Sequence, residues 1–206
     1  SRELWIRWLA LQPDRLQNLE RRKIQEFTSI LRMIVQANEG NRLVGKNIIA
    51  KYHTLFAEVA HFLPCWAVSA LSARSRIPFQ KAYFDLVVID ESSQCDIASI
   101  LPLLYRSKRA MVIGDPKQLR HITSLSMSQD RQLLEKADLQ ELGYGWAYAA
   151  NSLFDLAQGL CPKKSQVILR DHHRSRREII EFSNECFYAE APLRVATAYD
   201  RLVPLP

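Results

Sequence analysis

LVVIDESSQ, residues 86–94, decides the fold class of this chain. Its apolar run predicts a strand buried on both faces, which is typical of a parallel sheet. The strand ends in Asp90, and Glu91 follows at once. In a nucleotide hydrolase such an Asp holds Mg²⁺, usually through water, and such a Glu orients or deprotonates the attacking water. The alternative is an ordinary buried strand followed by an acidic turn.

A second buried strand is predicted over RAMVIGD, residues 109–115, one helix later. It ends in Gly114 and Asp115, and Gln118 lies on the loop beyond, where an amide can contact a γ-phosphate or its attacking water. Because parallel strands present their carboxyl ends at one edge of the sheet, we expect both acidic ends to meet there. Gly-Asp-Pro is also good turn chemistry in any protein. Two such strand ends with one helix between them nevertheless favour a functional site.

A third strand is predicted over SQVILRD, residues 165–171, followed by an amphipathic helix over residues 176–188. Arg174 lies between them, where its guanidinium can stabilise charge on a transferring phosphoryl group. The alternative is that the arginines of this stretch form only a solvated basic face. These arginines are Arg170, Arg174, Arg176 and Arg177.

The remaining pattern alternates between helices and strands. Strands that alternate with helices, with acids at the strand ends, predict an open, doubly wound α/β sheet with its site at that edge. A short strand is predicted over CWAVSAL, residues 65–71. Helices are predicted over two stretches of residues 3–36 that are broken at Pro13, from Ile48 to Val59, and over residues 96–105, 129–142 and 151–160.

Composition sets wider bounds. The 206 residues are 48% hydrophobic and 24% charged, which is typical of a globular protein, and the formal net charge of +6 suits a partner with phosphates. The four cysteines are scattered without metal-ligand spacing, which favours free thiols in a reducing, cytoplasmic compartment. No apolar run approaches the roughly 20 residues of a membrane span.

The order of these motifs resembles superfamily 1 helicases. IDESSQ (89–94), GDPKQL (114–119) and HHRS (172–175) followed by an amphipathic helix are similar to motifs II, III and IV of the branch that contains the nonsense-decay helicase, senataxin and related bacterial proteins. LPCWAVSALSARSRIP (63–78) resembles the segment before motif II, which lies near the nucleic-acid strand. The resemblance covers roughly residues 62–190. It implies a RecA-like P-loop NTPase domain with a parallel sheet.

The resemblance also implies roles for single residues. Asp90 would serve Mg²⁺, Glu91 would be the catalytic base, and Gln94 completes the DExxQ form of motif II. Asp115 and Gln118 would contact the nucleotide, with Gln118 coupling the γ-phosphate to the nucleic acid, and Arg174 would be an arginine finger. Ser69, Ser72 and Arg74 would face the nucleic-acid backbone. The implied cofactors and partners are ATP, Mg²⁺ and single-stranded DNA or RNA.

Some features depart from the family pattern. Ser92 stands where motif II often has Ala, and His173 stands where motif IV commonly has Tyr before its Arg. Residues 1–63 resemble a helical insertion, and residues 64–206 resemble the C-terminal part of the first RecA-like domain. The phosphate loop is expected upstream and a second RecA-like domain downstream in a longer protein. We therefore expect this piece to be inactive alone and its parent to be an ATP-dependent helicase.

EGNRLVGKNII, residues 39–49, nearly matches the phosphate loop GxxxxGK[ST]. Lys46 precedes Asp90 at a workable distance, and a helix follows it. However, Asn47 replaces the hydroxyl residue that ligates Mg²⁺, and the run before Gly40 has helical periodicity rather than that of a strand. We therefore predict a glycine-containing turn between two helices.

Two other classes of protein remain open. Asp171, His172 and His173 form a DHH sequence like that of metal-dependent phosphoesterases, which also need Asp and His ligands from earlier strands. Asp90 and Asp115 could supply carboxylates, but no His accompanies them. The other alternative is a non-catalytic module that docks nucleic acid or protein.

Overall fold

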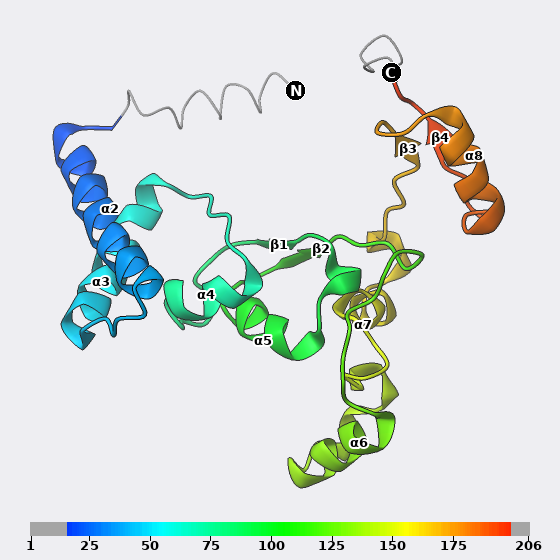
Figure 1. The fold of residues 1–206 in the computed structure, drawn as a ribbon, viewed down its shortest axis with the longest axis horizontal. Coiled ribbons are helices and arrows are strands. Elements are labelled where there is room, and N and C mark those ends of the chain that lie inside the picture. The colour runs from blue at the N-terminus through cyan, green and yellow to red at the C-terminus, as the bar shows by residue number, and fades with distance from the viewer. Residues whose placement is uncertain (1–15, 199–206) are drawn as a thin grey trace. The chain divides into compact units, whose positions relative to one another are not determined.

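The computed structural model of the protein describes residues 16–198 (Figure 1). The predicted helix before Pro13 lies outside this range. The α-helices are α2 (Asn18–Glu39), α3 (Lys46–Phe62), α4 (Ala70–Arg76), α5 (Ile97–Tyr105), α6 (Met127–Lys136), α7 (Leu153–Leu160) and α8 (Arg177–Cys186). The strands are β1 (Val87–Ile89), β2 (Ala110–Val112), β3 (Asp171–His172) and β4 (Arg194–Val195). Short 3₁₀ helices are η2 (Ser92–Gln94), η3 (Gln140–Leu142), η4 (Tyr144–Trp146) and η5 (Lys163–Ser165).

The chain forms two compact units. The first comprises residues up to Asp85 together with Pro102–Lys108, and the second comprises Leu86–Leu101 together with residues from Arg109 onward. These units are defined by packing within the chain. The predicted boundary between a helical insertion (residues 1–63) and a RecA-like domain (residues 64–206) therefore stays a prediction. Between residues 16 and 198, no helix combines the length and the apolar composition that a bilayer span needs.

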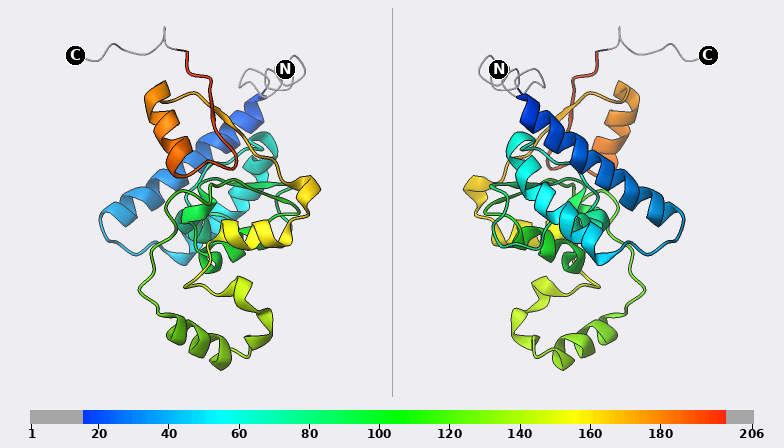
Figure 2. Two further views of the ribbon diagram at one scale, coloured as in Figure 1. Left: turned by 90° about the vertical axis from the view of Figure 1, so that its right-hand side faces the viewer. Right: turned by 90° about the vertical axis from the view of Figure 1, so that its left-hand side faces the viewer.

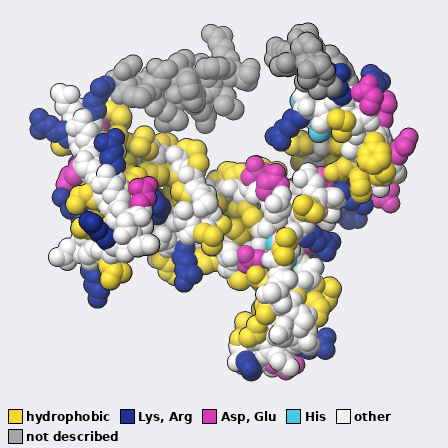
Figure 3. Space-filling model, in the orientation of Figure 1, with side chains coloured by type: hydrophobic (Ala, Val, Ile, Leu, Met, Phe, Trp, Pro, Cys, Tyr) yellow, Lys and Arg dark blue, Asp and Glu magenta, His cyan; other side chains and the backbone are white. Residues whose placement is uncertain are grey.

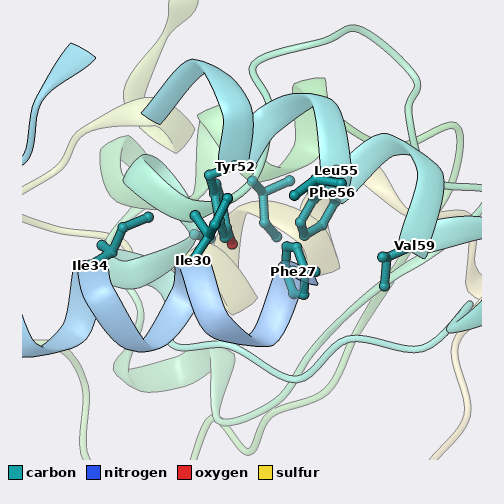
Figure 4. Close-up of a cluster of buried hydrophobic side chains, with 9 residues drawn as sticks. Phe27, Ile30, Ile34, Tyr52, Leu55, Phe56 and Val59 are labelled. Carbon is teal, nitrogen blue, oxygen red and sulfur yellow. The ribbon is translucent and has the colours of Figure 1, made fainter. Parts of the chain in front are cut away.

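The core of the first unit is a helical hairpin. α2 and α3 lie side by side in Figures 1 and 2, and their buried side chains point toward one another in Figure 4. Apolar residues at three- and four-residue steps put these side chains on one face of each helix. The rings of Phe27 and Tyr52 stack with centroids 5.2 Å apart. Both predicted helices are therefore confirmed. The buried residues of the two helices are Phe27, Ile30, Ile34, Tyr52, Leu55, Phe56 and Val59.

The strand predicted over residues 65–71 is wrong. Residues 63–69 have no regular structure, and α4 begins at Ala70. Ser69 caps this helix, because its hydroxyl accepts a hydrogen bond from the backbone N–H of Ser72 at 3.3 Å. Ala73 is fully buried against the hairpin core. The local cap and this packing favour a helix, whereas a strand would need a partner strand that the run lacks within residues 16–198.

Arg106 is a buried charge that closes the first unit. It is 3% exposed, and its guanidinium donates to Pro78 O at 3.0 Å, to Pro102 O at 2.7 Å and to Ile77 O at 3.1 Å. The guanidinium also lies 4.6 Å from the ring centre of Phe79. Burial lowers the pKa of Arg106. These bonds compensate the cost of burying the charge and fix the end of α5 to the segment that follows α4.

β1 and β2 form a two-stranded parallel sheet, as predicted for these stretches. The prediction that both faces of these strands are buried is wrong, however, because Val88 is 53% exposed and Met111 is 51% exposed. Such burial requires covering layers on both sides of a sheet. In the part of the chain that the structure describes, this sheet has only two strands. Its register pairs Val87 with Ala110, Val88 with Met111 and Ile89 with Val112.

The third predicted strand, residues 165–171, is present only at its end. β3 pairs in parallel with β4, in a sheet separate from that of β1 and β2. Val167, Ile168 and Leu169 are exposed to 81%, 73% and 82%. A strand persists only where its backbone groups find partners. None of the described strands pairs with these three residues, so a single doubly wound sheet is not present here.

The helices predicted downstream of β1 are all present with shifted ends. α6 begins after Ser126, whose hydroxyl accepts from Gln129 N while the Gln129 side chain accepts from Ser126 N. Asp138 adopts a positive φ of 54°, so the predicted helix over residues 129–142 is interrupted and ends in η3. α8 buries Ile180 but exposes Phe182, and Figure 3 shows hydrophobic side chains gathered over this helix.

Candidate functional site

Two carboxylates stand where β1 ends. Asp90 is exposed, and its Oδ1 accepts a hydrogen bond from Glu91 N at 3.0 Å. Glu91 adopts φ 51° and ψ 37°, a left-handed conformation that costs a residue with a side chain about 1–2 kcal/mol. Residues held in such conformations concentrate at functional sites. The sharp turn stops the strand and leaves both acids at its carboxyl end.

Gln94 lies next to Glu91. Its Nε2 donates to Glu91 Oε2 at 3.3 Å, and its backbone N–H donates to Glu91 O at 2.9 Å. The Cys95 thiol donates to the same backbone oxygen at 3.6 Å. Burial raises the pKa of Cys95, and the charges of Asp96 and Glu91 raise it further, so the thiol is neutral near pH 7. The Gln94 amide therefore orients the Glu91 carboxylate through one hydrogen bond.

Asp115 and Gln118 form the second part of the site, beyond β2. Gln118 Nε2 donates to Asp115 Oδ2 at 3.1 Å, and Gln118 N donates to Asp115 O at 3.2 Å. Asp115 Oδ1 accepts from Lys117 N at 2.9 Å. The carboxylate of Asp115 thus organises the loop that follows the strand and holds the Gln118 amide at its start.

Ser92 and Ser93 join the two strand ends. Ser92 is fully buried; its hydroxyl donates to Ile113 O at 2.7 Å, and its backbone N–H donates to the same oxygen at 2.9 Å. Ser93 Oγ accepts from Asp115 N at 3.4 Å. From sequence, Ser92 counts only as a small residue in place of alanine, whereas its hydroxyl makes a bond that alanine cannot make. The structure therefore brings the two predicted carboxylate motifs together, as their strand ends predict.

Gly114 is required by this close junction. A Cβ added there would lie 2.6 Å from Ser92 Oγ, 2.8 Å from Phe154 Cδ2 and 3.0 Å from Ser93 N. Ser92 and Phe154 are packed side chains, and the third neighbour is backbone, so none of them yields cheaply. The glycine allows β2 to end directly against η2.

We expect Gly114→Ala to lower the free energy of unfolding by about 2 kcal/mol, because the extra methyl group overpacks this junction. The matched control is Gly159→Ala in α7, where an added Cβ meets nothing within 4 Å. That change is expected to be neutral or to stabilise the helix by up to about 1 kcal/mol. Urea unfolding of both variants checks this, and equal stabilities would contradict the close junction.

Arg174 lies in a bend between β3 and α8 and is exposed. The bend is braced from the other side of its small sheet. Thr197 Oγ1 donates to Ser175 O at 2.7 Å, and His173 Nδ1 donates to Ala196 O at 3.0 Å. Within residues 16–198, the Arg174 guanidinium makes no hydrogen bond or ion pair, so it is available to an anion. The structure shows no contact between Arg174 and the carboxylates of Asp90 or Glu91.

The residues predicted to face nucleic acid lie in the first unit. Ser69 caps α4 and donates its hydroxyl hydrogen to Ser72 Oγ at 2.9 Å. Arg74 is exposed near the end of the same helix. The two hydroxyls are thus already engaged with each other and with the helix end. Their contact with nucleic acid stays a prediction.

Comparisons with known proteins bear on this arrangement. Residues 64–124 match the family model of an AAA domain, a class of P-loop NTPase. Uncharacterized ATP-dependent helicase MG140 of Mycoplasma genitalium is 25% identical over 134 residues, which are 65% of this chain and 12% of that protein. Probable helicase MAGATAMA 3 of Arabidopsis thaliana is 33% identical over 110 residues, 52% of this chain and 11% of that protein. Helicase SEN1 of Saccharomyces cerevisiae is 54% identical over 37 residues, 18% of this chain and 2% of that protein.

The helicase resemblance is confirmed. The matched AAA segment contains both carboxylate-bearing strand ends, at Asp90 and at Asp115, and the helix cap at Ser69. The chain spans 12% or less of the length of these three helicases.

Outside the AAA segment, the near-match to a phosphate loop is a turn between two helices, as predicted. α2 ends at Glu39 and α3 begins at Lys46, so a helix rather than a strand precedes it. Within the near-match, Gly40 N donates to Gln36 O at 3.1 Å, Asn41 N to Asn38 O at 3.1 Å and Arg42 N to Ala37 O at 2.8 Å, so these amides are bonded to the end of α2. In a phosphate loop such amides point at the phosphates. This turn therefore lacks the strand-to-helix geometry of a phosphate loop.

We expect fluorescent Mg²⁺-ATP to bind this chain weakly and equally in the wild type and in the Lys46→Ala variant. Lys46 is exposed and begins α3, a helix rather than a strand precedes the turn, and the amides of Gly40, Asn41 and Arg42 are bonded to the end of α2. An equilibrium titration of both proteins checks this. Micromolar binding that is lost in the variant would mean that residues 40–47 form a real phosphate loop.

The DHH sequence gives no support to the phosphoesterase alternative. Asp171 Oδ1 pairs with Arg194 Nε at 2.7 Å, and His173 donates to Ala196 O. Among residues 16–198, no group of three or more His, Cys, Asp or Glu side chains is arranged to hold a metal ion.

Proposed function

We propose that this chain is part of an ATP-dependent nucleic-acid helicase or translocase and carries its residues for Mg²⁺-ATP hydrolysis. One observation carries this proposal. The Asp90–Glu91 pair and the Asp115–Gln118 pair end two adjacent parallel strands and are bonded together through Ser92 and Ser93. A metal-binding acid, a base and a phosphate-sensing amide at one sheet edge are the parts that ATP hydrolysis needs.

Asp90 fits a Mg²⁺ site. Its carboxylate is exposed and, among the described residues, carries one hydrogen bond, from Glu91 N. Oxygen lone pairs therefore remain for the ion or for its bound water, and carboxylate oxygen is the ligand that Mg²⁺ prefers. When bound with ATP, Mg²⁺ neutralises part of the phosphate charge.

The other residues act on the substrate. Glu91, oriented by Gln94, positions the attacking water and accepts its proton. Gln118, which is hydrogen-bonded to Asp115, contacts the γ-phosphate. Through this contact it couples the presence of the γ-phosphate to nucleic-acid binding. Arg174 stabilises the negative charge of the transferring phosphoryl group with its guanidinium fork. In the longer protein, an upstream phosphate loop and a second RecA-like domain would complete the site.

Single-stranded DNA or RNA is the proposed partner, with Ser69, Ser72 and Arg74 toward its backbone. The net charge of +6 and the helicase names of the relatives support a phosphate-bearing partner. The cytoplasmic location stays a prediction.

The test is steady-state ATP hydrolysis by the longer protein, with and without single-stranded DNA and RNA oligonucleotides. We expect hydrolysis that requires Mg²⁺ and that one or both nucleic acids stimulate. Nucleic-acid binding without any hydrolysis would support the non-catalytic docking module instead. Phosphodiester cleavage with Mn²⁺ and without ATP would support the phosphoesterase.

A further inference from the structure

Tyr188 lies outside all three motifs but contacts the candidate site. It follows α8 closely, and its backbone N–H donates to Asn184 O at 3.2 Å. Its half-buried phenol donates a hydrogen bond to Asp115 Oδ2 at 2.5 Å. This bond ties the end of α8 to the loop after β2, far away in sequence.

The acceptor oxygen is shared. Asp115 Oδ2 accepts from Tyr188 and also from Gln118 Nε2, while Oδ1 accepts from Lys117 N. The position of this carboxylate therefore depends on Tyr188, and the position of the Gln118 amide depends on the carboxylate. Tyr188 therefore influences the position of the Gln118 side chain indirectly, through the Asp115 carboxylate to which both residues donate.

The bend that contains Arg174 precedes the N-terminal end of α8. Hydrogen bonds from the strand region after α8 fix both the helix and this bend. Asn184 Nδ2 donates to Leu193 O at 3.1 Å, and Leu193 N donates back to Asn184 Oδ1 at 2.8 Å. Thr197 Oγ1 donates to Ser175 O inside the bend. Through α8, the arginine-bearing bend and Tyr188 belong to one hydrogen-bonded segment.

We propose that Tyr188 is a positioning residue that couples the Arg174 segment to the Gln118 amide through Asp115. The inference rests on the proposed ATP hydrolysis. A displacement of the arginine segment would pull on Asp115 Oδ2 and shift Gln118, and a rearrangement at Gln118 would act back on the arginine.

The phenol is suited to this role over a wide pH range. Burial, together with the hydrogen bond to Asp115 and the charge of that carboxylate, raises the pKa of Tyr188 to about 12. Because the raised pKa lies above neutral pH, the phenol keeps its proton and stays a donor from acid pH to beyond pH 10. Phenylalanine keeps the ring and removes only the donor.

The test compares Tyr188→Phe with Tyr144→Phe in the longer protein. Tyr144 lies in the same unit and is 71% exposed, and within residues 16–198 its hydroxyl makes no hydrogen bond. We expect Tyr188→Phe to lower kcat for ATP hydrolysis by about tenfold, the size of one hydrogen bond to a charged group, with KM for ATP within about twofold of wild type. Tyr144→Phe should leave both constants unchanged. Hydrogen exchange of residues 115–120 should rise in Tyr188→Phe alone.

A double-mutant cycle with Gln118→Ala identifies the route. If Tyr188 acts through Gln118, Tyr188→Phe lowers kcat little further once Gln118 is truncated. An unchanged kcat in Tyr188→Phe overturns the inference, as does an equal loss in the Gln118→Ala background. A loss that comes with a lowered unfolding temperature and a raised KM overturns it too, because it indicates a purely structural role. An inactive wild type contradicts the proposed function itself and so is distinguished from these outcomes.

Discussion

Glu91→Gln is expected to lower kcat for ATP hydrolysis in the longer protein by about a hundredfold or more, the usual contribution of a general base. The substituted amide has the shape of the carboxylate, and its oxygen can still accept the hydrogen bond from Gln94 Nε2. It cannot take a proton from water. Because the geometry is kept, Mg²⁺-ATP binding should stay within about twofold of wild type. Steady-state hydrolysis and nucleotide titration together measure this.

The control for this change is Glu141→Gln in η3. Glu141 is exposed and lies in the same unit, so the control removes one negative charge without touching β1. Its kcat should equal that of the wild type. Turnover at the wild-type rate in Glu91→Gln would remove Glu91 from the role of base, whatever the control shows.

Arg174→Ala is expected to lower kcat by about a thousandfold, the lower end of the effect of an arginine finger. The guanidinium is exposed, and its bend is fixed by Thr197 and His173, so the charge is presented at a defined place. Arg174→Lys should recover little of the activity, because an ammonium group lacks the planar fork that binds a phosphoryl group. Single-turnover hydrolysis measures both variants.

The neighbouring Arg176 separates this role from a general effect of basic charge. Arg176 precedes α8 and lies two positions beyond Arg174, so Arg176→Ala removes the same charge from the same segment. Its kcat should stay within about threefold of wild type, since surface charges act weakly at a distance. Equal losses in Arg174→Ala and Arg176→Ala would indicate only a solvated basic face.

Local signals in the sequence predict much of the fold. The periodicity of α2 and α3 predicts their packed faces, and the apolar runs before Asp90 and Asp115 predict two parallel strands whose ends meet. Each of these signals lies within the element itself. The strand prediction for residues 65–71 is wrong because it rests on apolar content alone, whereas the cap at Ser69 starts a helix. Residues 167–169 have strand composition but no partner strand among the described residues.

The residues missed by sequence reasoning act across long stretches of chain. Ser92 binds the backbone of the next strand, Gly114 leaves room for Ser92 and Phe154, and Tyr188 reaches Asp115. None of these partners is visible as a spacing in the sequence. A small residue beside a motif, or a glycine at a strand end, is too common to predict such contacts. Only the tertiary structure shows that the hydroxyls of Ser92 and Tyr188 fix the segments that carry the acids, and that Gly114 leaves the space for this packing.

The structure of the longer protein with Mg²⁺ and a non-hydrolysable ATP analogue tests the central claim most directly. The claim is that the joined ends of β1 and β2 form the hydrolysis edge of the nucleotide site. The predicted result places the terminal phosphate beside Glu91 and Gln118, with Mg²⁺ on the side of Asp90. A nucleotide bound elsewhere, with these three side chains free of ligand, would contradict the account.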